Sequence, residues 1–196
     1  ALQTHIGGVV NQYAAVINIA VCDNKVTVNN TSGFFVGQKV LLIQMRGADI
    51  DANNSAAFGN IFNYETSGNY EIETIKSITG NVIEFVYVMK RRYDVSGYVQ
   101  LVSVQEYATA IIDSALRAKP WDGISGGVIM LEADTVILND SITVKGLGFK
   151  GAVAINDVSG QACFNGGVGG ATIYFCNTIE CGAPKGEGIG NSPFAY

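Results

Sequence analysis

The sequence contains a single histidine, His5, and only 15% of its residues are charged. A lone imidazole near the N-terminus leaves the chain without the usual general base of a hydrolase, and no serine lies in a nucleophile-elbow motif. The 12 Lys and Arg residues are scattered, and the net charge is −5. Nucleic-acid binding requires clustered positive charge that neutralises phosphates, so we expect no nucleic-acid partner.

Long hydrophobic runs are also missing. Polar residues interrupt each apolar stretch well before the ~20 residues that a membrane-spanning helix needs, so we expect no membrane insertion. The composition, with 24 Gly, 9 Tyr and 9 Phe beside few charges, is typical of extracellular β proteins. The chain starts at Ala1 without an initiator methionine, which fits a processed mature end and a trimmed fragment equally. We therefore expect a secreted protein.

Helical periodicity is nearly absent. Its best instance, residues 105–118, fits a strand almost as well, because its β-branched residues favour a pleated surface. Turn residues at 23–24 and 80–81 predict two hairpins, and residues 1–107 are expected to form a small antiparallel β-barrel or sandwich. The apolar runs on which this prediction rests lie at 15–21, 25–28, 38–45, 70–78, 82–88 and 99–104.

The spacing of the apolar runs changes in the second half of the chain. Short runs at 126–133, 135–139 and 141–146 are separated by one or two polar residues, as in successive rungs of a β-solenoid. An ordinary sandwich is the alternative. We therefore expect an all-β chain with short stacked strands over 108–160 and a Gly- and Cys-rich irregular segment over 161–196.

The four cysteines predict disulfides, because small segments of exported proteins are often stabilised in this way. Three of the four fall within the Gly-rich end, and we favour a bond from Cys163 to Cys176 or to Cys181. Buried free thiols are the alternative, since Cys also packs as a small hydrophobic residue. None of the spacings matches a zinc knuckle. The cysteines are Cys22, Cys163, Cys176 and Cys181.

No cofactor is predicted, and calcium is the only ion with a candidate site. Asp49, Asp51 and Asn53 are spaced like the first three ligands of a calcium-binding loop. Asn54 and Asn60 stand where that loop has Gly and Glu, so we expect the three side chains to serve turn geometry instead.

The remaining polar clusters give no catalytic residue. The acidic residues Glu132, Asp134 and Asp140 lie near the expected rungs, but their spacing selects no pair for glycoside hydrolysis. Residues 90–92, Lys-Arg-Arg, are interpreted as a solvated strand end, with a basic binding patch as the alternative. We expect a protein that is not an enzyme.

A resemblance to a known family extends over nearly the whole sequence. It is carried by residues 33–48, 57–59, 68–71, 93–97, 99–102, 120–123, 126–128, 146–151 and 185–189. Over these residues the chain resembles the N-terminal region of very large surface proteins of gliding Bacteroidota, which look like type IX secretion cargo and gliding-associated adhesins. It departs from them at 146–152, where relatives have Gly-Lys-Gly-Phe-Arg-Gly-Gly.

The resemblance implies an outer-surface location, delivery by the type IX secretion machinery and a non-enzymatic role in surface attachment or gliding motility. Implied partners are other segments of the same large protein, the secretion or gliding machinery and surface polysaccharide. It also implies O-glycosylation at Ser114, Thr135 or Ser141, each of which follows an aspartate and precedes an apolar residue. The alternatives are a β-helix that binds or processes polysaccharide, and a stalk cap that serves assembly.

Overall fold

The structure, a computed structural model, describes residues 2–53, 55–151 and 186–190. Nearly every element is a β-strand, which confirms the expected all-β class. Within these ranges the helical elements are the short 3-10 turns η1 (Val21–Asp23) and η2 (Val95–Gly97), and no helix is long enough to cross a membrane. The strands are β1 (Gln3–Gly8), β2 (Tyr13–Ala20), β3 (Lys25–Val28), β4 (Lys39–Gln44), β5 (Asp49–Ile50), β6 (Ile61–Asn63), β7 (Tyr70–Thr79), β8 (Val82–Phe85), β9 (Val99–Ser103), β10 (Gln105–Arg117), β11 (Leu131–Leu138) and β12 (Ile142–Thr143).

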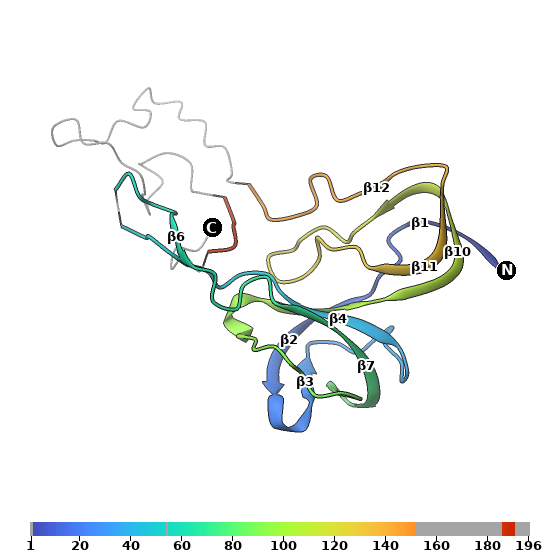
Figure 1. Cartoon of the computed structure of the whole chain (residues 1–196), viewed down its shortest axis with the longest axis horizontal. Helices are drawn as coiled ribbons and strands as arrows, with labels where there is room; N and C mark the ends of the chain where they lie inside the picture. Colours follow the sequence, from blue (N-terminus) through green and yellow to red (C-terminus); the bar gives the residue numbers. More distant parts are fainter. Residues whose placement is uncertain (1, 54, 152–185, 191–196) are drawn as a thin grey trace.

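Six strands close into an antiparallel barrel in the order β2-β3-β8-β7-β4-β9, in the lower half of Figure 1. Both predicted hairpins are confirmed, since β2 pairs with β3 and β7 with β8. Their turns contain Asn24 and Gly80, which adopt positive φ values of 53° and 57° that Asn and Gly tolerate best. Inward-facing apolar side chains fill the barrel, among them Val26, Val28, Val40, Leu42, Ile75, Ile83, Phe85 and Leu101.

A second, parallel sheet lies above the barrel in Figure 1. Its strands are ordered β1-β10-β11, and β12 pairs with the far end of β10. This confirms the expected stacking of short strands. Along the chain, all the barrel strands lie between β1 and β10, so the barrel is an insertion between the first two rungs. The sequence assigned residues 1–107 to one unit, whereas β1 pairs with β10 and not with the barrel.

The strands of the parallel sheet, which we call rungs, differ in detail from the strands that the sequence predicted. The segment considered as a helix is strand β10, because its β-branched residues pair with β1 on one side and with β11 on the other. Residues 131–138 form one strand instead of parts of two, and residues 126–130 form none. The polar residue Asp134 does not interrupt β11, since its side chain is exposed.

The inner face of β7 carries two acidic side chains. Glu71 and Glu73 alternate with the exposed Tyr70 and Ile72 along the strand. Glu73 is 5% exposed, and its Oε2 has no hydrogen-bond partner among the described residues. Burial raises the pKa of Glu73 to about 7; the Glu71 carboxylate adds to this rise and Lys90 opposes it. The ionised form of Glu73 is therefore disfavoured in the folded state.

We predict that Glu73→Gln stabilises the protein at neutral and alkaline pH. The folded chain binds the Glu73 proton more tightly than the unfolded chain, so the free energy of unfolding should fall as the pH rises through 7. The variant should lack this fall and exceed the wild type by about 1–3 kcal/mol near pH 8, with little difference near pH 4. Urea unfolding across this pH range measures both effects.

The exposed Glu65 provides the control. Glu65→Gln should leave the pH profile of the wild type unchanged. If the Glu73→Gln profile ran parallel to that of the wild type, Glu73 would not be the group that causes the pH dependence.

Candidate functional site

The segment from Phe85 to Tyr93 lies along β7 and is anchored at every fourth residue. The side chains of Phe85, Met89 and Tyr93 pack into the barrel core, whereas residues 86–88 and 90–92 are exposed. This spacing buries Phe85 and Met89, half-buries Tyr93 and exposes the two runs of side chains between them.

Three hydrogen bonds of 2.9 Å hold this segment in place. Successive residues of the segment bond to residues with decreasing numbers, Thr74, Glu71 and then Asn69. The segment therefore runs antiparallel to β7. The backbone beneath the exposed side chains is therefore fixed in the absence of any ligand. The pairs are Val86 N to Thr74 O, Lys90 N to Glu71 Oε2, and Asn69 Nδ2 to Arg92 O.

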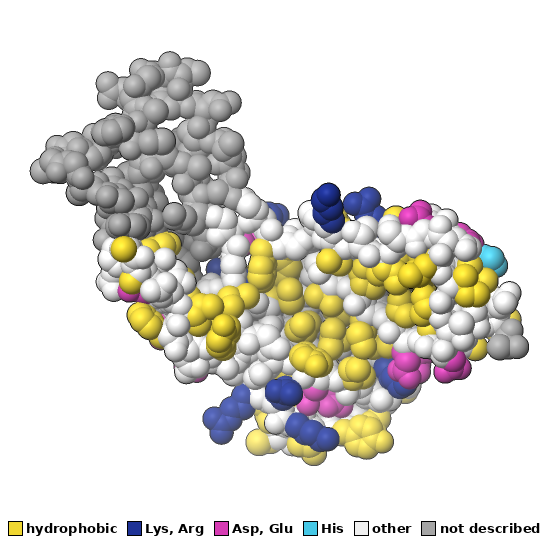
Figure 2. Space-filling model, turned by 45° about the horizontal axis from the view of Figure 1, so that its top comes forward, with side chains coloured by type: hydrophobic (Ala, Val, Ile, Leu, Met, Phe, Trp, Pro, Cys, Tyr) yellow, Lys and Arg dark blue, Asp and Glu magenta, His cyan; other side chains and the backbone are white. Residues whose placement is uncertain are grey.

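Exposed aromatic and basic side chains gather along this edge of the barrel. We call Tyr70, Tyr87, Lys90, Arg91 and Arg92 the aromatic–basic surface. Both tyrosines are more than half exposed, and the Arg91 guanidinium carbon lies 5.8 Å from the centroid of the Tyr70 ring. None of the three cations forms a salt bridge with a described residue. In Figure 2, Lys and Arg side chains stand beside hydrophobic ones over the barrel, at the lower edge of the molecule.

The chemistry of this surface suits a ligand that is both flat and anionic. An aromatic face packs against the apolar face of a ring, and an exposed guanidinium forms bidentate hydrogen bonds with a carboxylate. The sequence placed 90–92 at a strand end and left a binding patch as the alternative. It missed the tyrosines, because no local pattern brings Tyr70 next to residue 91.

A second charged cluster joins the barrel to the rungs. Lys39 Nζ lies 2.8 Å from carboxylate oxygens of both Glu106 and Glu132. These glutamates are register neighbours on β10 and β11, and hydrogen bonds to them raise the pKa of Lys39. The cation lies between two like charges that would otherwise repel each other. Glu132, considered as an acidic residue of a hydrolase, is therefore held in an ion pair.

Hydrogen-bonded polar side chains, which we call the polar ladder, connect β1, β10 and the residues after β11 at the bend between β11 and β12. His5 on β1 contacts Asp113 on β10, whose other oxygen accepts a hydrogen bond of 2.9 Å from Asn139 Nδ2 after β11. These bonds, that from Asn139 first, lower the pKa of Asp113. The sequence analysis noted His5 only as a residue near the N-terminus and missed these contacts, because it did not pair β1 with β10. Asp140 accepts hydrogen bonds from Ser141 at the same corner.

The three calcium candidates are arranged as a turn. Asp51 Oδ1 accepts hydrogen bonds from Asn53 N at 2.9 Å and from Asn53 Nδ2 at 2.8 Å, while the Asp49 side chain is exposed. Among the described residues, no group of three or more His, Cys, Asp or Glu side chains is placed to hold a metal ion.

The predicted modification and disulfide residues lie partly within the described ranges. Cys22 is exposed in η1 with a free thiol. The other three cysteines, Cys163, Cys176 and Cys181, lie outside the described residues. The glycosylation candidates Ser114, Thr135 and Ser141 are all exposed, on β10, on β11 and at the corner before β12.

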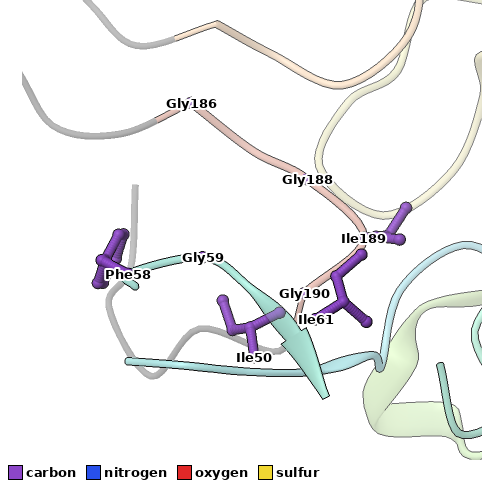
Figure 3. A pocket seen from close by; sticks show the side chains of 8 residues that line it. All are labelled: Ile50, Phe58, Gly59, Ile61, Gly186, Gly188, Ile189 and Gly190. Carbon is purple, nitrogen blue, oxygen red and sulfur yellow. The ribbon is translucent and has the colours of Figure 1, made fainter. Parts of the chain in front are cut away.

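An apolar pocket of about 390 Å³ lies beside β5 and β6 (Figure 3). Residues 186–190 form its second wall and are held by bonds from Gly47 N and Ala48 N to Ile189 O. No charged side chain lines the pocket, so a ligand in it would be held by apolar contact and by its shape. Its lining residues are Ile50, Phe58, Gly59, Ile61, Gly186, Gly188, Ile189 and Gly190.

Comparison with known proteins gives distant structural similarity only. No family model and no curated protein matches the sequence. Structurally, the chain is similar to the gp54 tailspike of Acinetobacter baumannii bacteriophage AP22, solved in complex with capsular saccharide (11% identity, TM-score 0.33, 66% of this chain, 22% of that one).

Two Pseudomonas phage tailspikes are similar in the same way. They are gp49 of phage LKA1 (10% identity, TM-score 0.32, 55% of this chain, 19% of that one) and gp61 of phage phi297 (12% identity, TM-score 0.31, 65% and 16%). The chain thus spans about a fifth of each tailspike. At these TM-scores we draw no argument from the likeness.

Proposed function

We propose that this chain is a non-catalytic attachment module that binds acidic polysaccharide through the aromatic–basic surface. The observation that carries the proposal is the exposed Tyr70–Arg91 pair, with Tyr87 also exposed on the segment that contains Arg91. Uronic-acid polymers combine ring faces that stack on tyrosine with carboxylates that pair with arginine.

The rigidity of the surface supports this proposal. Binding orders side chains and loops, and a segment that is already ordered loses less entropy on binding. Two buried side chains, Phe85 and Met89, the half-buried Tyr93 and three hydrogen bonds hold the 85–93 backbone. Only the exposed side chains would then need to be ordered by the polymer.

The family resemblance extends the proposal to the whole protein. We propose that the module belongs to the N-terminal part of a large cell-surface adhesin, delivered by type IX secretion and used in attachment or gliding. Contacts with the secretion or gliding machinery, and glycosylation at an exposed serine or threonine of the rungs, belong to the same proposal. The exposed positions of Ser114, Thr135 and Ser141 support the last of these.

We predict that the chain binds polygalacturonate and not neutral dextran, and that the binding weakens with added salt. Tyr87→Ala should weaken binding about 3–10-fold, from the loss of ~0.5–1.5 kcal/mol of ring contact. Arg91→Ala should weaken it by a similar factor and reduce its salt dependence. Affinity electrophoresis in gels that contain each polymer measures these effects.

The matched control is Phe62→Ala on β6, which removes an exposed ring from another part of the surface. Lys90 is left intact in these variants because it also acts on the pKa of Glu73. Equal binding by wild type, Tyr87→Ala and Arg91→Ala would exclude the aromatic–basic surface as the binding site.

Polysaccharide processing is the second candidate function, and product analysis separates it from binding. We predict that incubation with polygalacturonate yields no new reducing or unsaturated ends. Glu132 and the neighbouring Glu106 are both paired with Lys39, and Asp140 accepts hydrogen bonds from Ser141, so these carboxylates already have partners. Cleavage that disappeared in Glu132→Gln or Asp140→Asn would contradict the non-catalytic proposal.

A further inference from the structure

A buried acidic cluster lies against the segment that carries the aromatic–basic surface. It consists of Glu71 and Glu73 on the inner face of β7 and of Tyr93 at the end of the 85–93 segment. Each of these residues has a buried oxygen without a hydrogen-bond partner among the described residues, namely Glu71 Oε1, Glu73 Oε2 and Tyr93 Oη. A buried polar atom of this kind costs free energy until a partner reaches it.

The cluster is connected to the binding segment through Lys90. The second oxygen of Glu71, Oε2, accepts a hydrogen bond of 2.9 Å from Lys90 N, and the preceding residue, Met89, packs into the barrel core. The Lys90 cation also acts on Glu73, whose ionised form it stabilises. A cation that would hold an anionic polymer therefore lies within electrostatic reach of the two carboxyl groups beneath it.

The cluster is short of one hydrogen-bond donor. Burial, together with the nearby Glu71 carboxylate, raises the pKa of Tyr93, so the phenol keeps its proton and can donate to one carboxylate only. One proton bound by the two glutamates would supply the missing donor and would remove one of two neighbouring negative charges. Burial and the Glu71 charge raise the pKa of Glu73 to about 7, so this proton exchanges near neutral pH. In a coupled pair the proton belongs to both groups.

We propose that the binding of an anionic polymer at the aromatic–basic surface is coupled to the uptake of one proton by the Glu71–Glu73 pair. This inference rests on the function proposed above. A polymer carboxylate that pairs with Lys90 offsets the cation that stabilises ionised Glu73 and adds a negative charge nearby, so the proton is held more tightly in the complex. By linkage, the polymer binds more tightly to the chain that already carries the proton.

The charged groups on the neighbouring elements leave the pair as the group that titrates. On one side, β4 carries a single charged residue, Lys39, which is held in ion pairs with the parallel sheet. On the other side, the 85–93 segment carries three cations, of which Lys90 acts on Glu73 and Arg91 acts on Tyr93. The barrel core beside the pair contributes apolar side chains.

Isothermal titration calorimetry of the whole chain with polygalacturonate tests the coupling. The wild type should bind about 3–10-fold more tightly at pH 5.5 than at pH 8.5, a coupling of ordinary size between two sites. The carboxylates of the polymer, which titrate near pH ~4, stay ionised at both values. Glu73→Gln carries a neutral amide in place of the carboxyl group, so it should bind at pH 8.5 about as tightly as the wild type does at pH 5.5.

Two variants serve as controls. Imidazole is the side chain that ordinarily changes charge between pH 5 and 8, so His5→Gln tests the other explanation of a pH effect and should keep the dependence. Glu65→Gln makes the same chemical change at an exposed position and should keep it as well. Equal wild-type binding at both pH values, or a Glu73→Gln profile parallel to that of the wild type, would overturn the coupling and leave the proposed binding function in place. Absence of binding at both pH values would overturn both.

Proton uptake by the unmodified chain gives a second measurement that does not depend on a variant. Titrations at pH 7.5 in two buffers of different ionisation enthalpy count the protons that accompany binding. The wild type should take up protons, fewer than one for each bound chain, because part of the population already carries the proton at this pH. Binding without uptake, or with release of protons, would overturn the coupling.

Discussion

Buried amide side chains join the barrel to the parallel sheet, and the arrangement of the rest of the molecule depends on that junction. Gln100, fully buried on β9, donates to Gly126 O at 3.0 Å and accepts from Gly126 N at 2.7 Å. Asn11 bonds to Met130 in the same two directions. A side-chain amide offers one donor face and one acceptor face, as a peptide group does. These two residues thus take the place of a neighbouring strand for segment 126–130, whose buried backbone groups would otherwise cost ~1–3 kcal/mol each.

This junction explains why β9 is buried at every position. Its inner side chains face the barrel core, and its outer ones face the segment that leads into β11. The second contact, from Lys39 on β4 to Glu106 and Glu132, links another barrel strand to the same two rungs. These two contacts make the barrel a rigid base for the exposed segment along β7. A binding surface on a rigid base loses less conformational entropy when a ligand binds.

The sequence predicted the parts of this fold that depend on neighbouring residues. Two hairpins, the buried strand β4 and the stacked rungs all follow from local alternation and turn residues. The pairing of β1 with β10 does not, because it joins residues about a hundred positions apart and involves a strand that contains His5 and two glycines. For the same reason the polar ladder was missed, since its partners are brought together by stacking of the rungs. The Tyr70–Arg91 contact was missed because the segment after β8 continues along β7 without being a strand.

The side chains of β11 and β12, which form the third rung of the parallel sheet, have the apolar character of an interior strand. Natural sheets end in strands blunted by prolines, bulges or inward charges. Between Thr135 and Val144 the only charged residue is Asp140, which lies at the corner, and no proline is present. The apolar residues of β11 and β12 after Thr135 are at least as large as the buried residues of β10 with which they pair. Repeat proteins expose polar residues on their terminal units, whereas β11 and β12 expose apolar ones such as Leu138 and Ile142.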